Sequence, residues 1–388
     1  MNRSRENELL LSVARREVLE LHVPPQLDWD YILATARANG LLPLLQKHLS
    51  NGAIGLVPDL VSSHVLSALK REAVANSQSM LHLVSKQSRV YKLFQERGIP
   101  VALFKGALLA QMAYGEMSLR QAGDIDMLIN VRDFTPARAL LESLGYEMTP
   151  RLTSAQLTSH LSNNCEIQFM RDDWFTVIDL HWDLAPRSFV FELKADEVMS
   201  RLQSVSLAGA TVQTFGAEDL LLYQAMHGAK HLWRRLEWIS SLAESIRATP
   251  DVDWDTLINR ATNAHATRML ALGLRLVEQF SDVPVPIVAS IDKDASMQRM
   301  AAGIRATIFD SFGYADSTET NLYNLRIMDR KRDALISALR SIFVPTLPDW
   351  QALALPSSLH PLYYAYRPLR LSKVYGASLW RKLRPRAS

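Results

Sequence analysis

The chain has 388 residues, of which 48% are hydrophobic and 21% charged, and its formal net charge of +3 says little about partners. These proportions are ordinary for a globular protein, and the length suggests two or three domains. A single cysteine, Cys165, excludes an intramolecular disulfide and any zinc site built on several cysteines.

Apolar residues at helical spacing predict helices over most of residues 1–97. The pattern then changes, because the short apolar run 99–104 is typical of a buried strand. Residues 107–116 predict a helix. Residues 124–129 first alternate acidic and apolar side chains and then run apolar, which predicts a second strand.

Further along the chain, residues 133–144 predict a helix that closes at Gly145. A third strand is expected to begin at 146–148. Residues 165–170 and 175–181 predict the two strands of a hairpin, with the turn between them. From residue 218 to about 340 the pattern is helical again.

This order of elements predicts an α/β core between two helical regions. We expect an N-terminal helical region over 1–97, the core over 98–215, a C-terminal helical domain over 216–345 and a basic tail over 346–388. No apolar run is long enough for a membrane span, and the first apolar stretch is too short for a secretory signal. We therefore expect a cytoplasmic protein.

Three acidic residues carry the predicted chemistry. Asp124 and Asp126 are two apart on one strand, so their side chains project to the same side. Two carboxylates held so close repel each other unless a cation lies between them, and hard oxygen ligands suit Mg²⁺, with Mn²⁺ as the alternative. Asp179 lies in the later strand. A third carboxylate there would complete a two-metal site for phosphoryl displacement.

Basic and small residues beside these carboxylates predict a triphosphate site. Lys105 and Gly106 end the first strand and open a helix, where backbone N–H groups can approach a phosphate. Lys105 adds positive charge, and Arg120 can do the same just before the acidic pair. One D-x-D alone is a weak signal, and the match at Asp251 and Asp253 is interpreted as a solvated loop. The combination of all these features on successive strands is far more specific.

Histidines extend the candidate site. His181 lies two residues after Asp179 and shares its face of the strand, where it can act as a base or contact phosphate. His227 and His231 are four apart and share a helical face, which suits nucleotide or acceptor contact as well as packing. They are not a zinc pair of the HExxH type, because glycine replaces the required glutamate.

With these residues in place, the chain resembles the nucleotidyltransferase superfamily of DNA polymerase β-like folds. More closely it resembles a bacterial group of uncharacterised nucleotidyltransferase family proteins. The stretches that carry the resemblance are 103–106, 120–129, 144–146, 178–182, 227–239 and 355–368.

The resemblance implies an α+β fold, with a polymerase-β-like core of a small mixed sheet and flanking helices. It also implies that Asp124 and Asp126 bind both metals, that Asp179 binds one and helps to deprotonate the acceptor, and that Gly106 faces the triphosphate. The chain departs from the superfamily at the turn, where Lys105 and Gly106 replace the usual Gly-Ser. It also lacks the acidic residue that close relatives tend to carry shortly after Trp238.

We therefore predict transfer of a nucleotide monophosphate from ATP or another NTP to an acceptor hydroxyl or phosphate, on a small molecule, sugar, peptide or protein. The active site is expected between the core and the C-terminal helices. Transfer of the γ-phosphate by a kinase and a non-catalytic nucleotide- or partner-binding module stay open, as does the capping of tRNA.

The basic tail leaves three interpretations open. After Asp349 the chain has no acidic residue, and tyrosines and a tryptophan alternate with its arginines and lysines. Such a segment can contact RNA or an anionic membrane surface, or be a solvated end.

Overall fold

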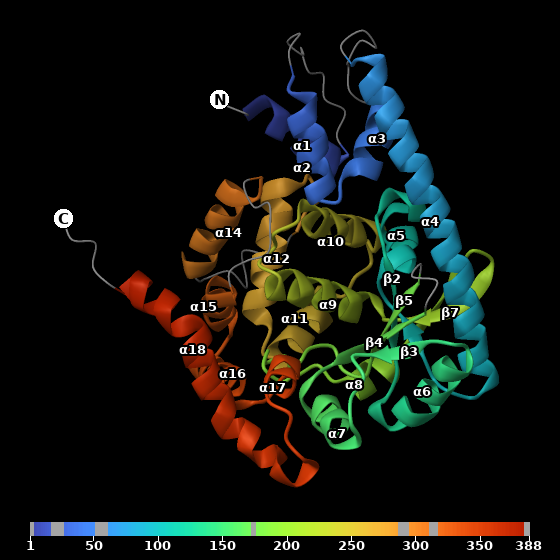
Figure 1. Cartoon of the computed structure of the whole chain (residues 1–388). Coiled ribbons are helices and arrows are strands. Elements are labelled where there is room, and N and C mark those ends of the chain that lie inside the picture. Colours follow the sequence, from blue (N-terminus) through green and yellow to red (C-terminus); the bar gives the residue numbers. More distant parts are fainter. Residues whose placement is uncertain are drawn as a thin grey trace.

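The computed structural model describes residues 4–16, 27–50, 61–171, 176–285, 295–309 and 317–383. Figure 1 shows a small sheet on one side of the molecule and a larger body of helices on the other, with the C-terminal helices along the outer edge. The sheet and its helices position the candidate site, so they are described first.

A five-stranded mixed sheet forms the centre of the α/β part, with strand order β1-β2-β5-β4-β3. The pair β2 and β5 is parallel, and the other neighbouring pairs are antiparallel. This confirms the small mixed sheet of an α+β fold. The strands are β1 (Ala102–Leu103), β2 (Asp124–Leu128), β3 (Glu147–Thr149), β4 (Glu166–Met170) and β5 (Val177–His181).

Helices cover this sheet and enclose its own hydrophobic core. The C-terminal half of the long helix α4 buries Leu83, Val84 and Phe94 against residues of β2 and β5 such as Ile125 and Ile178. Around the sheet lie α4 (Ser63–Glu96), α5 (Gly106–Tyr114), η2 (Met117–Leu119), η3 (Val131–Asp133), α6 (Phe134–Ser143), α7 (Ser154–Asn163) and α8 (Ala195–Met199), with a second, two-stranded sheet of β6 (Gln203–Leu207) and β7 (Ala210–Thr214).

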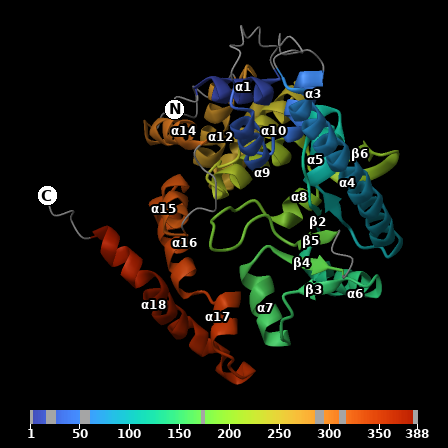
Figure 2. The same cartoon turned by 45° about the horizontal axis from the view of Figure 1, so that its top comes forward.

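A second core unites the first three helices with those that follow the sheet. Leu9 and Leu45 are fully buried in the same cluster as Leu242 and Leu272, which lie more than 190 residues later. The blue helices therefore rest on the yellow ones in Figures 1 and 2. This body contains α1 (Ser4–Arg15), α2 (Trp29–Ala38), α3 (Leu42–Ser50), α9 (Ala217–Lys230), α10 (Leu236–Ala248), α11 (Trp254–Asn263), α12 (Thr267–Phe280) and α14 (Ala295–Thr307).

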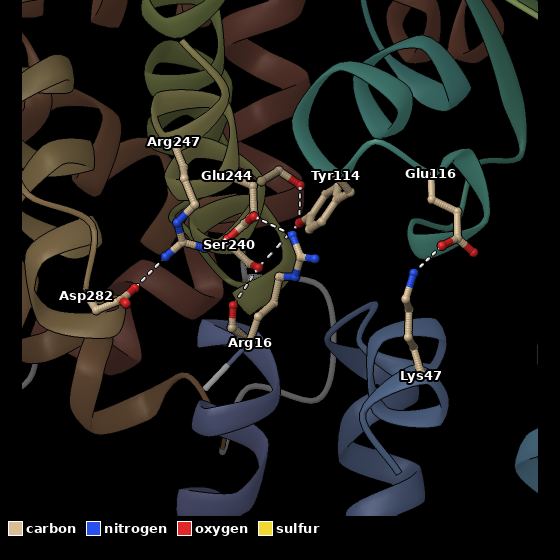
Figure 3. Close-up of polar contacts among 10 residues, drawn as sticks. Arg16, Lys47, Tyr114, Glu116, Ser240, Glu244, Arg247 and Asp282 are labelled. Atoms are coloured by element: carbon tan, nitrogen blue, oxygen red, sulfur yellow. Dashed lines mark hydrogen bonds and ion pairs between the residues drawn. The ribbon is translucent and has the colours of Figure 1, made fainter. Parts of the chain in front are cut away.

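Polar contacts join this helical body to α5, the helix that begins at the expected phosphate turn. The Tyr114 hydroxyl at the end of α5 lies 3.3 Å from Ser240 Oγ on α10, and burial raises the pKa of this tyrosine to about 12. Figure 3 shows this contact together with two ion pairs. Arg16 Nη1 lies 2.8 Å from Oε2 of the buried Glu244, and Lys47 pairs with Glu116. The far end of α5 is thus held at several points.

The C-terminal region, which includes the predicted basic tail, is largely helical over its described residues. It contains α15 (Ser317–Ile327), α16 (Lys331–Phe343), α17 (Leu347–Ala352), η4 (Ser357–Leu362) and α18 (Tyr363–Leu383).

Part of the tail's positive charge is used inside the fold. Arg367 and Arg370 each lie 2.6 Å from the fully buried Asp349. Tyr375 and Trp380 lie outside the residues whose side chains are described, so contact of the tail with nucleic acid or membrane stays a prediction. Within the described ranges, none of the helices combines the length and the apolar character that a membrane span requires.

The predicted elements mostly agree with the structure. The run 99–104 contains only a two-residue strand, and the next helix begins at Gly106. The strands 165–170 and 175–181 do pair as antiparallel neighbours, while most of their turn lies outside the described residues. The solvated-loop interpretation was wrong in part, because Asp253 caps α11 through its contact with the Thr256 backbone N–H. Helix α7 and the β6–β7 hairpin were not predicted.

Trp233, at the link between α9 and α10, is fully buried and packs on Gly228. A Cβ on Gly228 would lie only 2.5 Å from the Trp233 ring, and ring atoms buried this deeply cannot move aside. We expect Gly228→Ala to lower the free energy of unfolding by about 1–3 kcal/mol, the usual cost of overpacking. Urea unfolding followed by circular dichroism measures this change.

The matched control is Gly303→Ala in α14, where a Cβ would meet nothing within 4 Å. Alanine loses less backbone entropy than glycine in a helix, so this control should gain roughly 0.5–1 kcal/mol. Equal stability of the two variants would contradict the packing role assigned to Gly228.

Candidate active site

The register of the sheet brings the predicted acidic residues together. Asp126 on β2 lies directly opposite Asp179 on the parallel strand β5, and Asp124 lies opposite Val177. Because side chains two apart share a face of the sheet, Asp124, Asp126 and Asp179 project to the same side. His181, two residues beyond Asp179, joins them. The strand pair thus gathers residues that are more than 50 positions apart in the sequence.

Asp126 is the centre of this group, and two basic side chains contact the same oxygen. Lys105 Nζ donates a hydrogen bond to Asp126 Oδ1 at 2.7 Å, and His181 Nε2 lies 2.9 Å from that atom. Burial alone would raise the pKa of Asp126, but the Lys105 charge and the His181 contact outweigh it and hold that pKa well below its usual range. Asp126 is therefore a permanent anion, neutralised here by Lys105.

Asp179 is in the opposite electrostatic situation. Its carboxylate is buried, and its Oδ1 has no hydrogen-bond partner within the described part of the chain. Burial, followed by repulsion from Asp126 and Asp124, raises the pKa of Asp179 to about 6. The same two causes, burial and Asp126, raise the pKa of Asp124. For both carboxylates, burial and repulsion outweigh the nearby positive charges.

The donor set fits a divalent cation. Ligand atoms of Asp126, Asp179 and His181 all lie within 4.8 Å of one another. Buried carboxylate oxygens with an unpartnered lone pair suit a hard cation such as Mg²⁺ or Mn²⁺. Asp124 is not in that compact group and lies at its edge, at the start of β2. Lys105 holds part of the charge that a cation would supply.

Glu166 and Gln168 on β4 extend the site. Glu166 is paired with His181 across the sheet, and its Oε2 lies 3.1 Å from His181 Nδ1, although the two are not aligned for a hydrogen bond. Gln168 is paired with Asp179 and is exposed. The sequence pattern had a signal for both, because polar Glu166 and Gln168 alternate with apolar Ile167 and Phe169 on this strand.

The turn at Lys105 and Gly106 opens helix α5. Gly106 has a φ of +56°, in the left-handed region that favours glycine. A Cβ there would meet only ordinary contacts at 3.6 Å, so the backbone angle rather than space requires the glycine. Lys105 is the N-cap of α5 and makes no side-chain cap hydrogen bond. The first-turn N–H groups of α5 therefore lack the usual cap beside the carboxylates.

Arg120, the predicted triphosphate contact, forms an ion pair with a residue of the helical body. Its Nε lies 2.8 Å from Oε1 of Glu237 on α10, a buried residue that also pairs with Arg235. The charge of Arg120 still lowers the pKa of Asp124 in part. We interpret Arg120 as a link between the start of β2 and the helical body, with nucleotide contact left as a prediction.

His227 and His231 lie beside Lys105 rather than on the carboxylates. Their rings are 4.7 Å apart, and both pack against Trp238. Tyr223 stacks on His227, and its ring centroid lies 5.7 Å from Lys105 Nζ, which connects the histidines to Lys105. Burial, followed by nearby positive charge, lowers the pKa of His231 to about 4 and that of His227 well below its ordinary value. Both imidazoles are neutral near pH 7. Tyr223 was not predicted, since a tyrosine inside an apolar helix has no distinguishing pattern.

The comparisons with known proteins agree with this geometry. The family model described as uncharacterised nucleotidyltransferase matches residues 25–282, which is more than half of the chain. The chain belongs to this nucleotidyltransferase family. The general reaction is therefore transfer of a nucleotide monophosphate, and the protein is an enzyme of the transferase class. Among curated proteins, none matches the chain.

Solved structures give weaker likenesses to this nucleotidyltransferase. The antibiotic-resistance factor ANT(2'')-Ia in solution has 15% identity and a TM-score of 0.29, covering 48% of this chain and 90% of its own. Its complex with adenylyl-2''-tobramycin has 16% identity and a TM-score of 0.30, covering 48% and 97%. An antigenic nucleotidyltransferase-like protein from Paracoccidioides brasiliensis has 16% identity and a TM-score of 0.32, covering 54% and 91%. At such TM-scores no property is transferred to this chain.

Proposed function

We propose that this nucleotidyltransferase moves a nucleotide monophosphate from an NTP, with ATP as the first candidate, to an acceptor hydroxyl or phosphate. Mg²⁺, or Mn²⁺ in its place, would be held by Asp124, Asp126 and Asp179. The observation that carries the proposal is the direct opposition of Asp126 and Asp179, with Asp179 Oδ1 buried and unpartnered. A carboxylate pair in this state is expected to bind a divalent cation, which neutralises charge on the phosphate oxygens.

Different residues would bind the triphosphate and accept the proton of the acceptor. The uncapped N-terminus of α5 and the Lys105 ammonium bind the anionic triphosphate. An acceptor oxygen forms a bond to the α-phosphorus, the bond between that phosphorus and the α–β bridging oxygen breaks, and pyrophosphate leaves. Where the acceptor is a hydroxyl, its proton passes to the Asp179 carboxylate, which lies on the same face of the sheet as Asp126.

His181 and Glu166 position Asp126 in this proposal. His181 holds Asp126 Oδ1 from one side and approaches Glu166 from the other. His227 and His231, neutral and stacked on Trp238, present aromatic faces beside Lys105 for contact with the nucleotide. These roles remain proposals for each residue.

The test is incubation of the purified protein with Mg²⁺ or Mn²⁺ and each NTP, labelled at either the α- or the γ-phosphate, with cell extract as the source of acceptor. We expect α-label on an acceptor and release of pyrophosphate. The matched control is Asp126→Asn under the same conditions. Transfer of γ-label alone would overturn the proposal in favour of a kinase. A kinase is the second candidate because the turn at Lys105 and Gly106 departs from the usual Gly-Ser motif of nucleotidyltransferases. Nucleotide binding that is absent altogether would favour a non-catalytic module.

A further inference from the structure

A large cavity lies between the catalytic sheet and the C-terminal helices. Its volume is about 790 Å³, within the range of roughly 300–1,000 Å³ typical of ligand pockets. One side is formed by the end of α7, the segment 186–189 and the end of α9. The other side is formed by α15, α16 and α18, the orange and red helices beside α7 in Figures 1 and 2.

The charges that line this cavity are all of one sign. Arg187, Lys230, Arg340 and Arg367 contribute to the wall, and no aspartate or glutamate does. Arg367 is neutralised by Asp349, but within the described ranges no carboxylate lies at ion-pair distance from Arg187 or Lys230. Two cationic side chains therefore line the cavity without an ion pair within the described ranges, although Arg187 acts at longer range on Asp183 and Lys230 on Glu166. A ligand with negative charge would complement them.

The rest of the wall is largely apolar. Phe189, Leu325, Val344 and Leu371 line it, together with the exposed Ile342 of α16. An apolar lining with a few charged groups binds the body of a ligand by burial and orients it through its charged group. The complementary ligand is thus an amphiphilic anion, neither a small hydrophilic sugar nor a cation.

The cavity is linked to the candidate site through two residues of its wall, Asn164 and Lys230. Asn164, in its wall, is two residues before Glu166 on β4. Lys230, at the end of α9, acts electrostatically on both Glu166 and His231. Glu166 in turn contacts His181, which holds Asp126. A molecule in the cavity would therefore contact Lys230, whose charge acts on two residues of the candidate site.

We propose that this cavity binds the acceptor, and that the acceptor is an amphiphilic anion with an apolar body and a carboxylate or phosphate group. The inference rests on the proposed function, because it assumes that the catalytic residues transfer a nucleotide. The apolar body and the anionic group would be held in the cavity, and the reacting oxygen would extend toward Asp179. Contacts remote from the reacting atoms can contribute in this way to the rate.

Binding is tested by calorimetry on the full chain without nucleotide, below the micellar concentration of each probe. Dodecanoate and dodecyl phosphate present the two anionic groups on one apolar chain, and dodecyltrimethylammonium presents the opposite charge. We expect one or both anions to bind at least about tenfold more tightly than the cation, by complementarity with Arg187 and Lys230. The preferred anion distinguishes a carboxylate from a phosphate acceptor. Equal affinity for anion and cation would overturn the proposal.

Variants place the probe in the cavity. The double variant Lys230→Gln with Arg187→Gln should weaken anion binding by about tenfold or more, and Ala338→Phe, which fills space from α16, should abolish it. The matched control is Arg132→Gln, whose side chain is exposed and lies outside the cavity. Melting temperatures of all variants identify any that fail to fold. Unchanged binding in the double variant would overturn the site.

A separate readout distinguishes failure of this inference from failure of the proposed function. Transfer of α-label to the acceptor in cell extract should show a higher KM for acceptor in the double variant and an unchanged KM for NTP. Transfer that is identical in wild type and both cavity variants would overturn the acceptor site while leaving nucleotidyl transfer intact. Absence of α-label transfer in the wild type, with dodecanoate bound, would overturn the proposed function and leave an anion-binding cavity.

Discussion

Replacing Asp126 with Asn is expected to abolish nucleotidyl transfer and to destabilise the protein. Asp126 is the carboxylate that contacts both Lys105 and His181, and these contacts keep it anionic. Loss of its charge should lower the rate of nucleotidyl transfer by at least about a thousandfold. It also leaves the largely buried Lys105 ammonium without its charged partner. That loss should lower the free energy of unfolding by about 1–3 kcal/mol.

The measurements are α-label transfer and urea unfolding on the same preparation. Asp133→Asn, outside the site and on η3, is a suitable control for replacing an aspartate, and it should retain transfer. If Asp126→Asn keeps more than a tenth of the wild-type rate, Asp126 does not hold the metal. If it is as stable as wild type, the ion pair with Lys105 adds nothing to stability.

Replacing Asp179 with Asn is expected to abolish transfer but, in contrast, to stabilise the metal-free protein above pH 6. Burial and the two neighbouring carboxylates raise the pKa of Asp179 to about 6 in the folded state, whereas its ordinary value is 3.8. The folded state therefore holds this proton more tightly than the unfolded state. Stability is lost as pH rises from about 4 through 6, and asparagine, which has no charge, avoids that loss.

The gain for Asp179→Asn should be on the order of 2 kcal/mol at pH 7–8 and should vanish near pH 4. Melting temperatures measured across this pH range with EDTA test the sign. Addition of Mg²⁺ should then stabilise the wild type and not the variant, because binding to the folded state alone raises stability. A variant that is less stable than wild type at pH 8 would show that repulsion at Asp179 is already relieved in the metal-free fold.

These two aspartates show what can be read from local pattern and what cannot. Acidic residues within apolar runs predict the strands 124–129 and 175–181, and the spacing of Asp124 and Asp126 places their side chains on one face of the sheet. The residue types and the resemblance to nucleotidyltransferases were thus accessible from the sequence. That Asp126 is anionic and Asp179 holds its proton to about pH 6 depends on which cation reaches which oxygen.

Other features depended on contacts between distant segments. Arg120 pairs with Glu237, which lies 117 positions later in the chain, and only the folded structure brings the two together. The partner of Lys105 and the proximity of Tyr223 are of the same kind. A local sequence pattern indicates burial and periodicity. It contains no information on which charged residue from a distant segment will form an ion pair with a given side chain.

The α+β class, the strands that carry the acidic residues, the turn at Gly106 and the family could all be predicted from the sequence, because each depends on periodicity, backbone preference or short motifs. Three features followed only from the folded structure: the packing of the first three helices on those after the sheet, the pairing of Lys105 with Asp126, and the cationic, apolar cavity with Asn164 in its wall. The physical reason is that burial and electrostatic pairing act through space, over separations along the chain that no local window contains.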